Sequence, residues 1–145
     1  MNSLRRSGQG GFTLIELVII IVVLGILAAV AIPKYQDISA EAREAACRGA
    51  LGALRSGVTI FYANQAVQTG TATWPTLAEL ETAGNVMAHG IPKNPFQADA
   101  NAPDSIVTGV TKGDLVNGGA RGGWAYLPAT GEIWPNTNNI GENNW

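Results

Sequence analysis

The residues that could do chemistry are few and far apart. The chain has one cysteine, Cys47, and one histidine, His89. A catalytic nucleophile needs a base within hydrogen-bonding reach, and a zinc site needs several histidine or cysteine ligands at short spacing. Neither residue has such a companion nearby, and the serines and threonines are scattered. We therefore predict no enzyme activity, no metal site and no cofactor, with His89 as a loop residue.

Two weaker hypotheses about chemistry remain open. Asp99, Asp104 and Asp114 could contribute to a calcium site, although calcium loops concentrate their oxygen ligands at much tighter spacing. Four aromatic side chains could stack for electron transfer, but aromatic residues at helical spacing more often pack together. These four are Phe12, Tyr35, Phe61 and Tyr62.

Glu16 is the unusual carboxylate, because it lies inside the apolar run from Gly11 to Pro33. A helix over Phe12 to Ile32 would span ~32 Å, which matches the ~30 Å hydrocarbon core of a bilayer. A charged side chain at the centre of such a span costs roughly 2.5 to 3.5 kcal/mol. Glu16 therefore calls for a cationic partner, unless it lies at the membrane interface and reaches water.

Charge is distributed unevenly along the 145 residues, whose formal net charge is −2. Arg5 and Arg6 precede the apolar run, which predicts a cytoplasmic start and a head outside the cytoplasm. The rest of the chain shows no basic patch, so we expect no nucleic-acid binding. The run is longer than the apolar core of a secretory signal and contains Glu16, which favours its retention in the mature protein.

The segment from Gly11 to Glu16 reads GFTLIE, between the basic stretch MNSLRRSGQG and the long apolar run. It resembles the processing motif of type IV pilins and of the pseudopilins of type II secretion. The resemblance implies that a prepilin peptidase cuts between Gly11 and Phe12 and methylates the new amino group of Phe12. It also implies that Glu16 pairs with the Phe12 amine of a neighbouring subunit during assembly.

The same resemblance implies partners and a location. The precursor would lie in the bacterial inner membrane with a cytoplasmic leader, and would meet an inner-membrane assembly platform. It would then join a homo-oligomer, a helical filament that also holds related minor pilins, as an extracellular pilus or a periplasmic pseudopilus. The blocks AREAACRGALGALRSGVTIFYA and GGWAYLPATGEIWPN are similar to pilins of the mannose-sensitive haemagglutinin type. A single cysteine departs from the many type IVa pilins that close a C-terminal loop with a cystine.

Helical periodicity predicts that one helix continues through the apolar run to about residue 66. Gly25 and Pro33 are its weak points, since glycine costs ~1 kcal/mol and proline ~3 kcal/mol in a helix interior. The family resemblance implies melting between them in a filament, and the alternative is an intact helix with a kink at Pro33. An apolar stripe then recurs at steps of four and three: Cys47, Leu51, Leu54, Val58 and Phe61. We expect Cys47 to be a packed apolar residue of this face, or else an intermolecular bridge.

The remaining chain predicts a small head. Thr76 and Glu79 form a capping-box signature for a short helix over residues 77–83, with Gly84 as its terminator. Strand patterns appear at residues 105–108 and 123–127 and at 132–134, more weakly at 114–116, and suggest an antiparallel meander. Gly131 is expected at positive φ in the last hairpin turn.

Two orientations of the strand at 123–127 stay open. Successive strand residues face opposite sides, so Trp124 and Tyr126 would share one face. Either this aromatic face packs on the helix, or Ala125 and Leu127 do so and the aromatic residues form an outer surface.

The expected fold is α+β, with a long N-terminal helix packed against a small antiparallel β-sheet, as the likeness to pilins implies. We predict a leader at 1–11, a membrane or filament-core helix at 12–33 and its amphipathic half at 34–66. A loop region follows at 67–104, then the sheet at 105–135 and a flexible tail at 136–145. The expected function is a major or minor pilin for adhesion or motility. The alternatives are a type II secretion pseudopilin and a single-span anchored binding module that does not polymerise.

Overall fold

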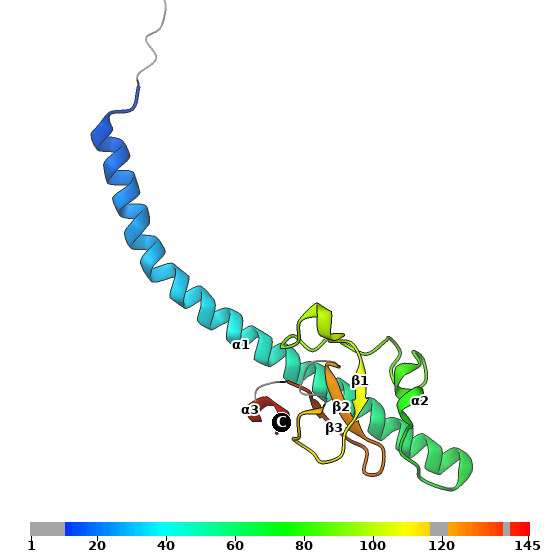
Figure 1. Cartoon of the computed structure of the whole chain (residues 1–145). Helices are drawn as coiled ribbons and strands as arrows, with labels where there is room; N and C mark the ends of the chain where they lie inside the picture. The colour runs from blue at the N-terminus through cyan, green and yellow to red at the C-terminus, as the bar shows by residue number, and fades with distance from the viewer. Residues whose placement is uncertain (1–10, 117–121, 138–139) are drawn as a thin grey trace, which may run out of the picture. The chain divides into compact units, whose positions relative to one another are not determined.

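The computed structural model describes residues 11–116, 122–137 and 140–145. Along the chain the elements are α1 (Leu14–Thr69), α2 (Leu77–Glu81), the 3₁₀ helix η1 (Asp99–Asn101), β1 (Ile106–Thr108), β2 (Trp124–Leu127), β3 (Glu132–Pro135) and α3 (Ile140–Asn143) (Figure 1). They fall into two compact units, Met1–Ala40 and Glu41–Trp145, which are described separately below. The predicted leader lies outside the described residues except for Gly11.

In the first unit, no other residues that the structure describes cover the apolar stretch of α1. Every side chain from residue 11 to residue 38 is exposed, including Phe12 at 84% and Leu14 at 80%. By length and composition α1 could cross a membrane. The helix runs without a break across Gly25 and Pro33, although Pro33 has no N–H to donate to the preceding turn. An apolar surface of this extent requires lipid or protein around it in the cell.

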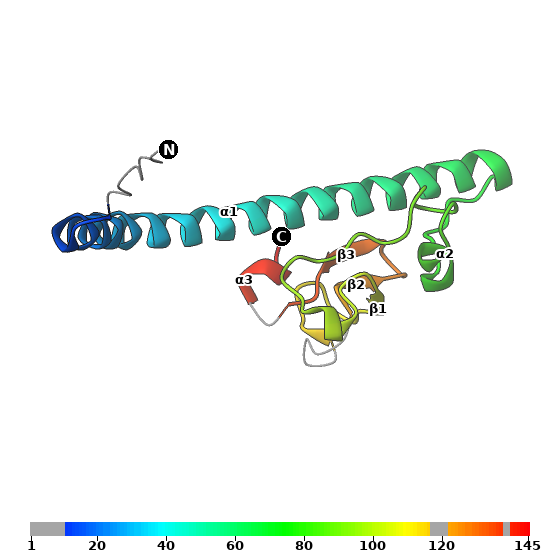
Figure 2. The same cartoon turned by 90° about the horizontal axis from the view of Figure 1, so that it is seen from above.

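In the second unit, one face of α1 supports the head. Figures 1 and 2 both place the sheet alongside this C-terminal part of α1. The predicted stripe is confirmed, because Cys47, Leu51, Leu54 and Val58 are each no more than 2% exposed. Phe61, at the end of the stripe, is half-buried. Apolar residues three and four apart share one helix face, which explains why this period carries the core.

The sheet has three strands in the order β1-β2-β3. β2 and β3 are antiparallel, with Tyr126 opposite Ile133, whereas β1 and β2 are parallel, with Ile106 opposite Trp124. The expected wholly antiparallel meander is therefore wrong for β1, and the sheet is mixed. A parallel neighbour requires a long return connection. The chain between β1 and β2 provides that connection, so β2 begins at the same end of the sheet as β1.

Both faces of β2 are covered. Trp124 and Tyr126 are completely buried in the core that α1 contributes to, together with Ile106, Ile133 and Leu80. The orientation that packs the aromatic residues on the helix is thus confirmed. On the opposite face Ala125 and Trp134 are also completely buried.

Residues 109–116 cover part of the second face of the sheet. A Cβ on Gly109 would lie 2.2 Å from Trp134 Cη2, so only glycine permits this approach. The indole Nε1 of Trp134 donates to the Asp114 carbonyl at 3.0 Å. The predicted weak strand at 114–116 does not form, because these backbone groups bond to side chains instead of to a neighbouring strand. Val116, for example, donates its N–H to Asn136 Oδ1 at 2.9 Å.

Two predicted local signals are present. Thr76 and Glu79 form the expected capping box at the start of α2. The helix ends at Glu81, two residues earlier than predicted, and Gly84 follows at φ 95°. Gly131 adopts φ 74° in the turn between β2 and β3, as expected.

The predicted flexible tail is wrong for the described residues of 136–145. They include α3 and bury Asn136, Thr137 and Asn143, each at most 2% exposed. Trp145 lies edge-on to Phe96, with ring centroids 6.0 Å apart. An asparagine-rich segment is polar, but each asparagine can satisfy several backbone groups at once. Asn136 and Asn143 use that capacity to attach the described part of this segment to the head.

Candidate functional site

The segment from Gly11 to Glu16 is the candidate site for processing and assembly. α1 begins at Leu14, so Phe12 and Thr13 precede the helix and are accessible. The backbone N–H and the hydroxyl of Thr13 both donate to Glu16 Oε2, each at 2.8 Å. The Glu16 N–H in turn donates to Thr13 Oγ1 at 3.3 Å. This reciprocal arrangement is a capping box, and it satisfies donors at the helix start.

Sequence reasoning missed Thr13 as the residue that holds Glu16. The signal was available, because a threonine followed three residues later by a glutamate is the same signature that identified Thr76 and Glu79. The structure brings Phe12, Thr13 and Glu16 together at one helix start.

Gly25 and Pro33 lie apart from this site on the same helix. A Cβ added at Gly25 would meet no atom within 4 Å, so no close contact within the chain requires glycine there. Both residues are helical in this structure. Their expected role as weak points of the helix in a filament therefore stays a prediction.

Cys47 lies in the core of the head and is completely buried. Its thiol donates to Asn94 Oδ1 at 3.7 Å. Burial raises the pKa of the Cys47 thiol to about 12, so it is almost wholly protonated at neutral pH. A buried, protonated thiol suits the packed apolar residue that the sequence predicts and does not suit an intermolecular bridge.

The other chemical candidates do not converge. Within the described ranges, no three histidine, cysteine, aspartate or glutamate side chains are grouped to hold a metal ion. Asp99 pairs instead with Lys93 at 2.9 Å, and His89 is exposed. Tyr62 stacks on Trp74 with ring centroids 4.0 Å apart, which is a packing contact within the head.

Three buried asparagines, which sequence reasoning missed, connect separate loops of the head. Asn94 donates to the Gly123 carbonyl at 2.7 Å and accepts from the Phe96 N–H at 3.0 Å. Asn143 exchanges hydrogen bonds with the backbone of Thr137 at 2.9 and 3.0 Å. Asn136 is the third and bridges loops in the same way. These contacts hold the C-terminal region in a chain that has no second cysteine for a cystine loop.

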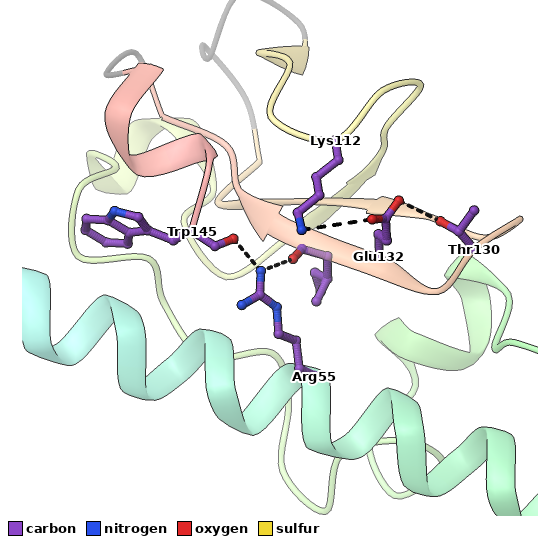
Figure 3. Close-up of polar contacts among 6 residues, drawn as sticks. Arg55, Lys112, Thr130, Glu132 and Trp145 are labelled. Carbon is purple, nitrogen blue, oxygen red and sulfur yellow. Dashed lines mark hydrogen bonds and ion pairs between the residues drawn. The ribbon is translucent and has the colours of Figure 1, made fainter.

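Arg55 connects α1 to β3 and to Trp145 through hydrogen bonds (Figure 3). Its Nη2 donates to the Ile133 carbonyl at 3.1 Å and also to the Trp145 carbonyl. Burial lowers the pKa of the Arg55 guanidinium, which nevertheless stays charged at neutral pH. The guanidinium of Arg48 lies 4.2 Å from the centroid of the Trp145 ring. Arg55 and Arg48 of α1 therefore both contact Trp145, the first through a hydrogen bond and the second through a cation–π contact.

Comparison with known proteins gives matches at the N-terminal motif and over most of the chain. Residues 6–32 match the prokaryotic N-terminal methylation motif. A type IV major pilin protein PilE1 of Neisseria gonorrhoeae is 36% identical over 117 residues, which are 81% of this chain and 49% of the relative. Fimbrial protein EcpC of Eikenella corrodens is 32% identical over 126 residues, 86% of this chain and 77% of the relative. A fimbrial protein of Pseudomonas aeruginosa is 29% identical, covering 80% of this chain and 76% of the relative.

The chain is shorter than several of these relatives. It spans 49% and 62% of the lengths of two gonococcal major pilins. No solved structure matches the chain significantly. The narrower likeness to the mannose-sensitive haemagglutinin type stays a prediction.

Proposed function

The chain belongs to the type IV pilin family, and we propose that it is a structural subunit of a type IV pilus-like filament. The observation that carries this proposal is the coincidence of the methylation motif at residues 6–32 with an uncovered apolar helix. The relatives named above are pilins and fimbrial proteins.

Processing is the first step. A prepilin peptidase cuts between Gly11 and Phe12 and methylates the freed amine of Phe12. Both residues are exposed and precede the first residue of α1, so an enzyme reaches the bond without unwinding the helix. The cut leaves Phe12 as a new cationic N-terminus, four residues before the Glu16 carboxylate.

Assembly follows from the apolar helix and this new charge. The precursor is anchored in the inner membrane by α1, with its leader in the cytoplasm. In the filament, the apolar side chains of residues 12–32 exchange lipid for the same surface of other copies. The Phe12 amine of one copy pairs with Glu16 of the next, and mutual pairing offsets part of the desolvation cost of both charges.

The partners follow from the same scheme. They are further copies of this chain, related minor pilins, the prepilin peptidase and an inner-membrane assembly platform. The finished filament lies outside the cell. The relatives do not favour the pseudopilin of type II secretion or the non-polymerising membrane anchor, because they bear the names of pilins and fimbrial proteins.

Mass spectrometry of the native protein tests the proposal most directly. Protein sheared from the cell surface should begin at Phe12 and carry one additional methyl group on its amine. An otherwise identical strain without prepilin peptidase is the control, and there the protein should keep residues 1–11 and stay in the membrane fraction. Surface filaments whose subunits begin at Met1 would contradict the proposal.

A further inference from the structure

The loop at residues 83–91 lies against α1, and the assembly scheme above gives it no role. Its backbone hydrogen bonds are local, such as that from the Gly84 N–H to the Met87 carbonyl at 2.7 Å. Among the described residues, none of this loop forms a hydrogen bond with α1 or with the sheet. Val86, Met87 and Ile91 instead pack against the core to which α1 contributes. The attachment of this loop, as far as the structure describes it, is therefore apolar.

The sulfur of Met87 is seated on a position of α1 that has no side chain. A Cβ on Gly57 would lie 2.7 Å from Met87 Sδ and 3.0 Å from the Val86 carbonyl oxygen. Gly57 is itself buried, so the thioether and Val86 occupy the space where a side chain would otherwise stand. Methionine is flexible and its sulfur is polarisable, so it fills an irregular space of this kind well. Met87 therefore makes a close contact between the loop and the helix.

Met87 lies at the edge of the core, within reach of solvent. The residue is half-buried, whereas Leu54 and Val58 of the same core are at most 1% exposed. The chain has only two methionines, and the other, Met1, belongs to the predicted leader. Cys47, which carries the other sulfur atom of the head, is completely buried. Of these two sulfur atoms, that of Met87 is therefore the one that a dissolved oxidant reaches more readily.

We propose that Met87 is an oxidation site for peroxides and that its sulfoxide releases residues 83–91 from α1. In the reaction, a lone pair of the thioether sulfur attacks one oxygen of hydrogen peroxide, and the O–O bond breaks. The departing hydroxide takes the proton of the transferred OH group and leaves as water, so the protein exchanges no proton. The sulfur loses two electrons and the peroxide gains them. A methionine sulfoxide reductase reverses the change.

The new oxygen causes the release, because a sulfoxide is polar and accepts hydrogen bonds. Gly57 offers it no free donor, since an N–H in the middle of a helix is bonded to the preceding turn. Val86 presents a carbonyl oxygen and a methyl group at the same place, and neither is a donor. A buried acceptor without a donor is unfavourable, so the oxidised side chain turns towards water. The loop moves with it, because the remaining contacts of Val86 and Ile91 are apolar.

The test uses the full chain in dodecylphosphocholine micelles, with ¹³C in the methyl group of methionine. Only Met1 and Met87 give signals, and Met87→Leu assigns the one in the head. Before oxidation, the Met87 methyl group should show nuclear Overhauser contacts to the α protons of Gly57. After treatment with hydrogen peroxide, the signal should move to the position of a sulfoxide methyl group and lose these contacts. Methionine sulfoxide reductase should restore both.

Proteolysis measures the site and the opening. Trypsin cuts after Arg55 and Lys93, so Met87 is the only methionine of the fragment 56–93, and Cys47 lies in another fragment. Mass spectrometry of this fragment should show one added oxygen, located at Met87. Thermolysin cuts before large apolar residues, and its cleavage within residues 83–91 should be about tenfold faster after oxidation. Cleavage of a locally opened segment follows the population of the open form.

Met87→Leu is the matched control for the oxidised chain. Leucine is apolar and similar in volume to methionine, so this variant should keep the loop closed. It has no sulfur at position 87, so peroxide should leave its rate of cleavage by thermolysin unchanged. The comparison separates oxidation of Met87 from oxidation of any other group.

Three results would overturn the proposal. The first is a folded chain in which Met87 resists a peroxide treatment that oxidises it after unfolding. The second is an oxidised chain that keeps the contacts to Gly57 and the original rate of cleavage. The third is equal acceleration of cleavage in the wild type and in Met87→Leu, because that would locate the effect elsewhere. None of these results depends on filament assembly, so they leave the proposed function untouched.

Discussion

Thr13 holds the Glu16 carboxylate through two hydrogen bonds that end on the same oxygen, Oε2, each 2.8 Å long. The second oxygen, Oε1, receives no hydrogen bond from the residues that the structure describes. The free chain therefore reduces the cost of a carboxylate in an apolar run without using all of its acceptor capacity. Oε1 is available to the amine of another copy in the proposed filament, while Thr13 keeps the side chain oriented.

Replacement of Glu16 by alanine should separate anchoring from assembly. Membrane insertion depends on the apolar run, so the amount of Glu16→Ala protein in membranes should stay near the wild-type level. Filament yield should fall by about tenfold or more, because an unpaired amine buried among apolar helices costs roughly 3 to 5 kcal/mol. Immunoblots of sheared surface material and of membranes from the same cells measure both quantities.

Glu79→Ala is the matched control for Glu16→Ala. Glu79 occupies the equivalent position of a second capping box, where Thr76 donates to it at 2.8 and 2.7 Å. Its removal disturbs the start of α2 in the head and leaves the N-terminal segment intact, so filaments should form in normal amounts. Wild-type filament yield from Glu16→Ala would refute the proposed pairing.

Cys47 should resist alkylation in the folded chain. It is completely buried, and the rise of its pKa from 9.0 to about 12 leaves about a thousandfold less thiolate at any pH below both values. Iodoacetamide at pH 8 should add no mass to the folded chain in micelles and one adduct after unfolding in guanidinium chloride.

A Cys47→Ser/Ala53→Cys double variant controls for access of the reagent. Ala53 is exposed on the same helix, so a cysteine placed there should react readily in the folded chain. Rapid labelling of native Cys47, or wild-type dimers that disappear with a reducing agent, would show that the thiol is accessible.

Tyr126 should make the head sensitive to alkaline pH. Its hydroxyl donates to the Pro75 carbonyl at 2.8 Å, and burial raises its pKa to about 12, compared with about 10 in an unfolded chain. Between these values the unfolded chain loses the proton and the folded chain keeps it, so the free energy of unfolding falls as pH rises. The loss approaches about 1.4 kcal/mol per pH unit and reaches roughly 2 to 3 kcal/mol near pH 12.

Tyr126→Phe isolates this effect, since Cys47 titrates in both proteins. At pH 7 the variant should be about 1 kcal/mol less stable, because it loses one buried hydrogen bond. Above pH 10 the difference should shrink and then reverse. Urea unfolding followed by tryptophan fluorescence gives the comparison, and a difference that stays constant from pH 7 to pH 12 would contradict the assignment.

Local patterns explain which features could be predicted from the sequence. The apolar stripe from Cys47 to Val58, the Thr76–Glu79 capping box and the turn at Gly131 each depend on residues only a few positions apart. The parallel direction of β1 could not be inferred in this way, because nothing in a short apolar strand specifies which way its neighbour runs. The order of the C-terminal segment depends on Asn136, whose partner Val116 lies 20 positions away.

The candidate functional residues also include some that a short motif predicts and others that depend on long-range contacts. Phe12 and Glu16 stand in one short motif, so the sequence alone is enough to predict a role for them, and the Thr13–Glu16 capping box follows from the same motif. The contacts of Arg55 could not be predicted, because its partners Ile133 and Trp145 lie 78 and 90 positions away. No spacing relates these residues until the fold brings their segments together.

Asn136 should be essential for the stability of the head. Its Oδ1 accepts from the Val116 N–H at 2.9 Å, and its Nδ2 donates to the carbonyls of Val116 and Gly122 at 3.1 and 3.2 Å. The residue is completely buried, so Asn136→Ala would leave several backbone groups without partners. Each unsatisfied group costs about 1 to 3 kcal/mol, and we expect a loss of roughly 2 to 4 kcal/mol in the free energy of unfolding. Urea unfolding measures it, with Asn64→Ala on the exposed face of α1 as the control, which should change stability by less than about 0.5 kcal/mol. Equal unfolding midpoints for the two variants would show that the asparagine contacts do not hold the C-terminal region.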